Sequence, residues 1–417
     1  MLREYFRHVS GFSSASKLFL AAQFLYGIGQ SAMWVLRNLY LKEAGFEEAA
    51  IGQTLSASAV GMAVVVLAIP PLMDRMTLRA FQIAGTILLA GGLAGVTFVH
   101  GVWSMLGCCF VSGVGTSLLE VGTAPFFVRH STPEERPYLF GVGTALSPTA
   151  GLIATLGVKA GALAWGENLS AYGNILLWAA GATLLAIFPL AFTREAAPEP
   201  PEREERRFDW KTAARFFLPE VAFGLGAGLT IPFINLYFRL RFQVPAGTVG
   251  LYYAWAQALM MAAFLGAPLI ARRLGAVRTI VLFQLTSIPF FLALAWTVSL
   301  PVAVGAFMLR HACMNMVHPV GSNFAMEVVH PRQRARVNGL KQLANKLAWV
   351  VATWTGGLMI DRVGDWKNRH GLVDGLTLTM LITIVLYVIG SAMYWKFFSK
   401  EAAGQVPAPE AEPTVGA

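Results

Sequence analysis

The sequence contains few charged residues. Asp, Glu, Lys and Arg make up 13% of its 417 residues, whereas soluble domains contain about 25%. Hydrophobic residues make up 56%, and the mean hydropathy is +0.57. The charges that are present occur in short clusters between long apolar runs. This composition excludes an ordinary soluble globule and predicts a chain that crosses a membrane many times.

Cysteine is also scarce, and several chemical motifs are missing. Cys108, Cys109 and Cys313 lie in apolar runs, which gives no disulfide pattern of the secreted type. No G-x-x-x-x-G-K-[ST] sequence occurs, which argues against an ATP-driven pump. No Cys/His cluster has metal-ligand spacing, so we expect no metal and no cofactor. We find no nucleophile with a positioned base and no paired carboxylates at one depth, and therefore expect that the protein is not an enzyme.

Twelve apolar runs are long enough to cross a bilayer as helices. A hydrocarbon core of about 30 Å needs about 20 helical residues, and barrel strands of about 10 alternating residues do not fit these runs. The first run is full-length with no cleavage pattern before it, so we expect it to be retained. We predict an all-α polytopic membrane protein with spans at 18–41, 50–73, 79–100, 103–128, 138–163, 172–193, 217–240, 248–271, 278–299, 302–328, 339–361 and 373–397.

Lys and Arg are distributed unequally between the connections. Most of them lie on the side that holds both ends of the chain. By the positive-inside rule we expect both termini in the cytoplasm and the protein in the cytoplasmic (plasma) membrane. The formal net charge of +9 is then explained by orientation and by lipid headgroups. We expect no nucleic-acid partner.

The sequence repeats itself at a nearly constant offset. "PEERPYLFG" (133–141) and "PRQRARVNG" (331–339) both begin with Pro, place Arg three residues later and end on Gly, at an offset of 331 − 133 = 198. The same offset relates Gly52 to Gly250. Two copies in the same orientation predict parallel repeats around an axis normal to the membrane.

A second pair of matching stretches supports the repeat. "NLY" occurs at 38–40 and at 235–237, an offset of 197. Two such six-helix halves surround a central cavity that opens to either side by rocking, as in an alternating-access carrier. The expected units are an N-terminal bundle at 1–193, a cytoplasmic linker at 194–216, a C-terminal bundle at 217–398 and a disordered cytoplasmic tail at 399–417.

The connection between the second and third spans carries a family resemblance. "PPLMDRMTLR" (70–79) resembles the G-x-x-x-D-R-x-G-R-K motif of the major facilitator superfamily, with Pro70 and Thr77 at the two Gly positions. The resemblance covers essentially the whole chain. It implies that Asp74 and its basic neighbours form a charge relay on the cytoplasmic face. The residues expected in this cytoplasmic gate are Asp74, Arg75, Arg79, Arg129, Arg136, Arg273 and Arg334.

Ionisable side chains occur at membrane depth, where their cost makes a functional role the first hypothesis. Glu120 lies 129 − 120 = 9 residues before Arg129, or about 13 Å along a helix. The offset of 198 pairs Glu120 with His318 and places two polar stripes opposite each other across the cavity. The proton-coupling candidates are Glu120, His318 and His311; the substrate-cavity candidates are Arg310, Asn315, Ser112, Thr116, Arg37, Lys346 and Trp34.

Each of these residues also has a structural interpretation. Glu120 or Arg310 fits a fixed ion pair between spans, and a buried histidine fits simple packing. Arg37 and Lys346 are close enough to the ends of their spans to extend to an interface.

The first half also resembles part of an antiporter motif. "GTALSPTAGL" (143–152) is similar to the G-x-x-x-G-P-x-x-G-G sequence of drug and proton antiporters at Gly143, Pro148 and Gly151. We therefore expect a monomeric secondary active transporter that exports a small amphipathic or hydrophobic solute, with protons and the lipid bilayer as its other partners. An uptake symporter or uncoupled facilitator for a polar or anionic metabolite is the alternative. A transporter-derived sensor or a membrane-embedded enzyme is a minor one.

Overall fold

The computed structural model describes residues 11–75, 77–132, 135–193, 209–330, 333–363 and 374–402. Within these ranges the secondary structure is helical and contains no strand. The first half contains α2 (Ser14–Glu43), α3 (Glu48–Arg75), α4 (Leu78–Phe98), α5 (Val102–Arg129), α6 (Arg136–Trp165), α7 (Leu169–Leu185) and α8 (Ile187–Ala191). The second half contains α9 (Trp210–Thr230), η1 (Ile231–Phe233), α10 (Ile234–Phe242), α11 (Ala246–Leu274), α12 (Ala276–Trp296), α13 (Leu300–Val328), α14 (Arg334–Val363) and α15 (Gly375–Ala402).

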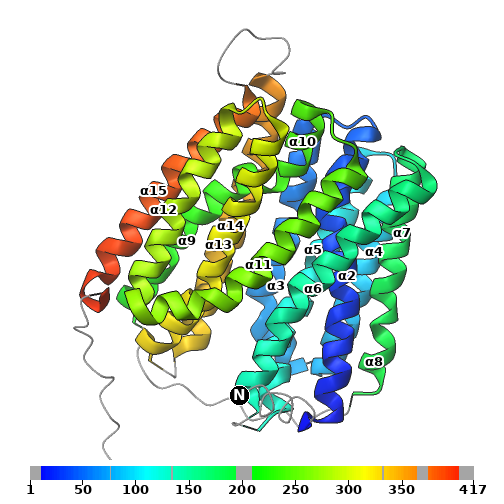
Figure 1. Cartoon of the computed structure of the whole chain (residues 1–417). Helices are drawn as coiled ribbons and strands as arrows, with labels where there is room; N and C mark the ends of the chain where they lie inside the picture. Colours follow the sequence, from blue (N-terminus) through cyan, green and yellow to red (C-terminus); the bar gives the residue numbers. More distant parts are fainter. Residues whose placement is uncertain are drawn as a thin grey trace, which may run out of the picture.

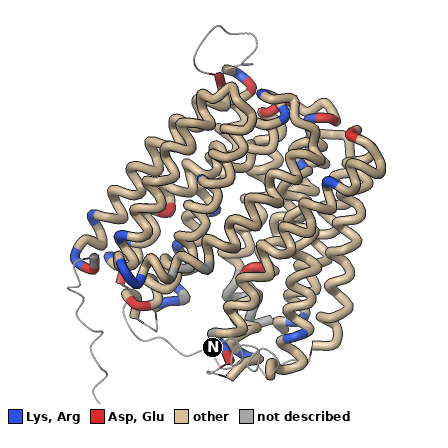
Figure 2. The backbone as a smooth tube through the Cα atoms, in the orientation of Figure 1, with Lys and Arg blue, Asp and Glu red and all other residues tan. Residues whose placement is uncertain are grey.

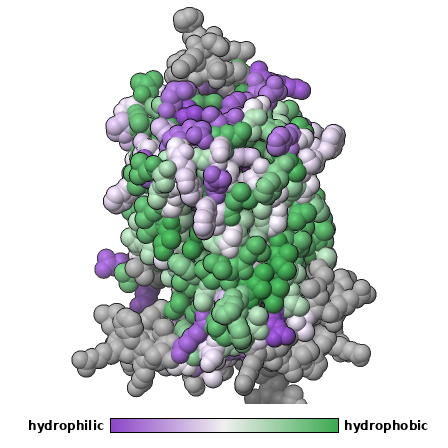
Figure 3. All heavy atoms as spheres, turned by 90° about the vertical axis from the view of Figure 1, so that its right-hand side faces the viewer, coloured by the Kyte–Doolittle hydropathy of each residue, from purple (hydrophilic) through white to green (hydrophobic). Residues whose placement is uncertain are grey.

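These helices have the length and the surface of membrane spans. In the described ranges, ten helical segments are long and apolar enough to cross a membrane. α11 and α14, with 29 and 30 residues, are also long enough, and α14 is less apolar because it carries several of the charges discussed below. The side view shows an apolar belt between hydrophilic ends (Figure 3), and most charged residues lie at those ends (Figure 2). The predicted all-α polytopic membrane fold is confirmed.

The helix boundaries reproduce the sequence repeat. Adding 198 to the bounds of α4 gives 78 + 198 = 276 and 98 + 198 = 296, the bounds of α12. Adding 198 to those of α6 gives 136 + 198 = 334 and 165 + 198 = 363, the bounds of α14. Within the described ranges the helices therefore fall into two sets of six, in which α7 with α8, and α9 with η1 and α10, each count as one.

The two halves lie side by side and meet at one end. We call the end where α2 begins and α15 finishes the termini end, and the opposite end, where α10 lies, the far end (Figure 1). The halves converge at the far end and diverge toward the termini end (Figure 1). α3 packs against α14, and α6 packs against α11. These two helix pairs are counterparts in the repeat.

Glycines allow the backbones to approach closely in both of these helix pairs. A Cβ atom on Gly52 would lie 2.6 Å from the Thr353 carbonyl oxygen, and a Cβ atom on Gly250 would lie 3.0 Å from that of Thr155. Because 52 + 198 = 250 and 155 + 198 = 353, this is one contact made twice. Small residues at such crossings let membrane helices pack closely. The repeated glycines found in the sequence therefore join the two halves.

Two helix ends differ from the boundaries predicted for the soluble segments. α9 begins at Trp210, inside the predicted linker, because Asp209 caps it by accepting hydrogen bonds from the Lys211 and Thr212 amides at 3.0 and 3.2 Å. The hydrogen bond from the Thr212 hydroxyl holds the pKa of Asp209 below its usual value. α15 continues to Ala402, inside the predicted tail. Residues 194–208 and 403–417 lie outside the described residues.

A buried ion pair stabilises the second half near the far end. Arg241 at the end of α10 contacts Asp374 at 3.4 Å, and the two side chains are only 3% and 6% exposed. Asp374 also accepts a hydrogen bond from the Thr377 amide at the start of α15. The pair therefore links α10 to α15.

Replacing Asp374 with Ala should lower the free energy of unfolding by about 3–5 kcal/mol, since it leaves the Arg241 charge buried without its partner. Thermal melting in detergent checks this result. The control is Glu43→Ala, which removes the exposed Glu43–Arg239 pair (35% and 31% exposed) and should cost no more than about 1 kcal/mol. Equal melting temperatures for the two variants would contradict the prediction.

Candidate functional site

An ion pair joins the two halves near mid-depth. The Lys346 ammonium of α14 lies 3.3 Å from the Glu120 carboxylate of α5. The Glu120 side chain is 42% exposed and the Lys346 side chain is 20% exposed. A charged pair within the spans that stays accessible faces a space between the halves rather than their packed interiors. The structure thus brings together two of the residues selected from the sequence, one from each half.

Aromatic rings lie next to this pair on the side of the far end. Trp349 is 349 − 346 = 3 residues beyond Lys346 on α14, and its ring centroid is 5.9 Å from that of Trp34 on α2, at an interplanar angle of 48°. The Trp34 side chain is exposed. On the first half, the Tyr26 hydroxyl lies 3.5 Å from that of Thr123, which is one turn from Glu120 on α5. The site combines a carboxylate, an ammonium group, the exposed Trp34 ring and the half-buried Trp349, contributed by both halves.

A second charged cluster lies in the second half, and the sequence analysis missed its acid. The Glu220 carboxylate of α9 lies 2.9 Å from the Lys341 ammonium and 3.4 Å from the Asn345 amide nitrogen, both on α14. His318 on α13 is within electrostatic reach of Glu220 and Lys341. The charges of Glu220 and Lys341 therefore act on this imidazole.

The sequence repeat could have identified Glu220 as a candidate. Gln23 on α2 donates a hydrogen bond to the Gly143 carbonyl on α6 at 3.1 Å. Gln23 corresponds to Glu220 at an offset of 197, and Gly143 corresponds to Lys341 at an offset of 198. The same helix contact is thus neutral in the first half and charged in the second.

Several of the other predicted cavity residues bond within their own half. Ser112 and Thr116 are buried and donate to the Cys109 and Ser112 carbonyls of their own helix. Asn315 donates to the His311 carbonyl at 2.8 Å, and the Nε2 atom of His311 is buried without a hydrogen-bond partner. Ser112 and Thr116 are therefore buried in the first half, whereas Asn315 and His311 are half-buried.

Two of the predicted cavity residues, Arg310 and Arg37, are buried arginines that also lie inside their halves. Arg310 donates to the Tyr387 hydroxyl at 3.0 Å and stacks over the Phe291 ring at 4.7 Å, between α12 and α15. Arg37 is buried on α2, and its Nε and Nη1 atoms have no hydrogen-bond partner. Neither contact set includes Glu120.

The predicted gate residues lie at the termini end. Arg136 donates to the Val128 carbonyl at 3.2 Å and Arg334 to the Val329 carbonyl at 3.1 Å, so the repeated Arg bonds near the end of the preceding helix in both halves. Arg79 donates to the Thr193 carbonyl at 3.4 Å. Arg129 is the last residue of α5, and Arg273 lies one residue before the end of α11. The side chains of Asp74 and Arg75 lie outside the described residues.

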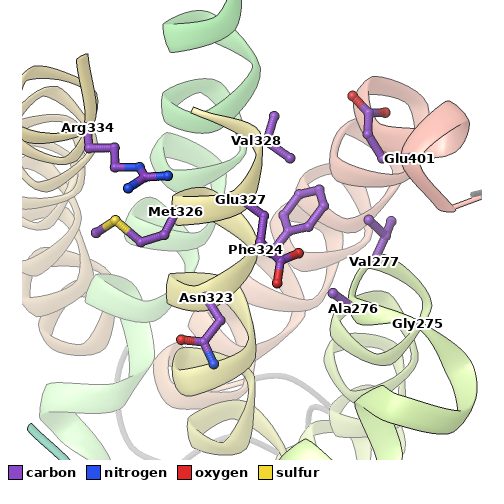
Figure 4. A pocket seen from close by; sticks show the side chains of 10 residues that line it. All are labelled: Gly275, Ala276, Val277, Asn323, Phe324, Met326, Glu327, Val328, Arg334 and Glu401. Carbon is purple, nitrogen blue, oxygen red and sulfur yellow. The ribbon is translucent and has the colours of Figure 1, made fainter. Parts of the chain in front are cut away.

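A cavity of about 730 Å³ lies away from the Glu120–Lys346 pair. Its lining comes from the start of α12, the last turns of α13, Arg334 and Glu401 near the end of α15 (Figure 4). All of these elements belong to the second half. Because the pocket does not lie between the halves, we do not assign the transport site to it. Within the described ranges, no group of three or more His, Cys, Asp or Glu residues is placed to hold a metal ion.

Solved structures share this fold. The structure superimposes on a D-xylose-proton symporter with a TM-score of 0.75 at 13% identity, covering 92% of this chain and 97% of that one. It matches the nucleoside transporter NupG with a TM-score of 0.71 at 14% identity, covering 92% and 99%. At this level of identity the likeness concerns the fold alone.

Sequence relatives and a family model agree with the fold. The MFS-type transporter YcaD of Escherichia coli K12 is 24% identical over 186 residues, 45% of this chain and 47% of that protein. YcaD of Salmonella arizonae is 22% identical over 217 residues, 52% and 54%. The chain therefore spans about half the length of the curated relatives it matches. The model of the Major Facilitator Superfamily matches residues 19–309 and 216–416. The chain belongs to the major facilitator superfamily, and this membership points to a multi-pass membrane transporter rather than an enzyme.

Proposed function

We propose that this transporter exchanges protons for a small amphipathic cation, which it exports, and that Glu120 binds both in turn. The observation that carries the proposal is the Glu120–Lys346 ion pair, which joins the two halves and yet leaves the Glu120 side chain 42% exposed. A proton or a cationic solute that neutralises Glu120 releases Lys346. Binding at this one residue therefore breaks a bond between the halves.

Competition for one carboxylate leads to exchange rather than co-transport. A proton and a cation cannot both neutralise Glu120, so each one displaces the other. The Glu120 side chain is also more exposed than the Lys346 side chain, 42% against 20%, which favours a cationic over an anionic solute. The exposed Trp34 ring and its neighbour Trp349 offer apolar faces and cation–π contacts to the rest of such a solute.

The direction follows from the predicted orientation. The halves diverge at the termini end (Figure 1), and the positive-inside rule places the termini in the cytoplasm. A solute then enters from the cytoplasm while Glu120 is ionised. A proton taken up from outside after the halves rock releases the solute there, so an inward proton gradient drives export.

Binding measured across pH tests the proposal. We expect the lipophilic cation tetraphenylphosphonium to quench the tryptophan fluorescence of the purified protein. Its Kd should fall as the pH rises, by up to about tenfold per pH unit, until Glu120 is fully ionised. Binding of the cation should also release protons from the protein.

Benzoate distinguishes the alternative, uptake of an anionic metabolite. An anion needs Lys346 free, and so needs Glu120 protonated. If benzoate binds more tightly as the pH falls and the cation does not bind, the solute is an anion and the transporter is a symporter. Binding of the cation with no pH dependence would contradict proton exchange.

A further inference from the structure

Two buried asparagines connect the halves at the far end. Asn38 on α2 is 2% exposed and Asn235 on α10 is 0% exposed. The Asn38 side-chain amide donates to the Pro232 carbonyl at 2.6 Å, and the Asn235 side-chain amide donates to the Val35 carbonyl at 2.8 Å. Both asparagines begin the repeated "NLY" sequence.

The repeat makes these two hydrogen bonds equivalent. Asn38 corresponds to Asn235, because 38 + 197 = 235, and Val35 corresponds to Pro232, because 35 + 197 = 232. Each asparagine therefore donates to the carbonyl at the same repeat position in the other half. Such a reciprocal contact forms only where the two copies meet at the axis that relates them. The asparagines therefore lie where the halves must separate if the far end opens.

A break in the second copy makes the Pro232 carbonyl available. In a continuous helix this carbonyl would accept from the Leu236 amide, four residues later. Here the Leu236 amide donates instead to the Asn235 side-chain oxygen at 2.8 Å, and η1 separates α9 from α10. Asn235 thus frees the carbonyl that Asn38 uses, and its own amide is oriented toward Val35.

We propose that Asn38 and Asn235 form a gate latch that holds the far end closed and sets the resting state of the transporter. Opening the far end moves α2 away from α10 and breaks both hydrogen bonds at once. Each broken bond leaves an asparagine amide that only entering water can satisfy, and the loss of the Asn38 bond also leaves the Pro232 carbonyl without this donor. The neighbouring Glu43–Arg239 pair at 3.3 Å is exposed and contributes little to closure. The latch does not depend on Glu120 or on the nature of the solute.

Distance measurements between spin labels test the latch. The full-length protein without its native cysteines, in lipid nanodiscs, is labelled at Glu47 and Gln243 at the far end, or at Thr132 and Arg273 at the termini end; all four side chains are exposed. We expect Asn38→Ala to raise the ratio of far-end-open to far-end-closed molecules about fivefold, the effect of one lost buried hydrogen bond. Asn38→Ala combined with Asn235→Ala should raise it further.

Two variants separate a latch from a merely structural role. Asn38→Asp keeps the size of the side chain but points an acceptor at the Pro232 carbonyl, so it should open the far end at least as much as Asn38→Ala. The matched control is Thr86→Ala, which removes a buried hydroxyl that bonds only to the Gln82 carbonyl of its own helix at 2.9 Å. It should leave the ratio unchanged.

The outcomes are distinct. Longer far-end distances together with shorter termini-end distances in the Asn38 variants support the latch. Unchanged distances in Asn38→Ala, Asn38→Asp and Asn235→Ala would overturn it, as would an equal shift in Thr86→Ala. Failure of the proton-exchange proposal leaves all these results as expected, since the labels report the halves and not the solute.

Discussion

Glu120→Gln should reduce proton-driven transport of a cationic probe by about 100-fold or more. The glutamine neither releases a proton nor carries the charge that attracts a cation, and removing a charged partner from a partly desolvated site costs about 3 kcal/mol. The site is defined by the Glu120 carboxylate 3.3 Å from Lys346. The measurement is efflux of tetraphenylphosphonium from proteoliposomes under an imposed pH gradient.

Glu220→Gln is the matched control for this prediction. Glu220 also pairs with a lysine of α14, Lys341 at 2.9 Å, but both residues belong to the second half. Its loss therefore breaks no bond between the halves, and proton-driven efflux should stay within about threefold of the unmodified protein. Lys346→Gln should retain efflux, because the Glu120 carboxylate that binds the proton and the cation in turn is still present. Full activity of Glu120→Gln at every pH would remove Glu120 from the mechanism.

Gly357→Leu should abolish transport by preventing closure of the far end. A Cβ atom on Gly357 would lie 2.6 Å from the Glu48 carbonyl oxygen and 2.8 Å from the Gly52 Cα. Both neighbours are backbone atoms of α3, which cannot move aside without moving the helix. A leucine therefore forces α3 and α14 apart where they join the halves. We expect at least about a 100-fold loss of efflux, since a carrier that cannot close one end cannot alternate.

Spin labels at the far end and a second glycine complete the test of Gly357→Leu. The labels at Glu47 and Gln243 should report longer distances in Gly357→Leu. Gly91→Leu on α4 is the control, because Gly91 is exposed and a Cβ atom there meets nothing within 4 Å. Normal efflux by Gly357→Leu, with unchanged far-end distances, would mean that the α3–α14 crossing does not hold the halves together.

Helices and their repetition were predictable because both depend on local sequence. Apolar runs of sufficient length must be helical in a bilayer, where every backbone amide needs an internal partner. The offset of 198 read from "PEERPYLFG" and "PRQRARVNG" reproduces the bounds of α12 and α14 from those of α4 and α6. The break at η1 was not predicted, because residues 217–240 form one apolar run in which Pro232 alone marks the interruption.

The partners of the site residues were less predictable. The offset paired Glu120 with His318, whereas the structure pairs Glu120 with Lys346 and places His318 near Glu220 and Lys341. A repeat axis relates two residues by symmetry but makes them neighbours only when they lie close to it. Asn38 and Asn235 lie at the axis and interact. Glu120 and His318 are equivalent in the repeat, yet Glu120 pairs with Lys346.

By itself, the sequence determined that this chain is surrounded by lipid, that its apolar runs form helical spans and that these helices repeat at an offset of 198. It also determined that few charges lie at membrane depth. These properties could be predicted because composition and periodicity belong to single helices and do not depend on how the helices pack. Only the tertiary structure decided which charges meet, that Arg310 and Arg37 are buried inside their halves, and that the halves are joined at the far end. Those outcomes depend on the rotation of each helix about its own axis and on the approach of backbones at glycines such as Gly52 and Gly357. The helix rotations and the backbone approaches are both set by packing between segments that are distant in the sequence.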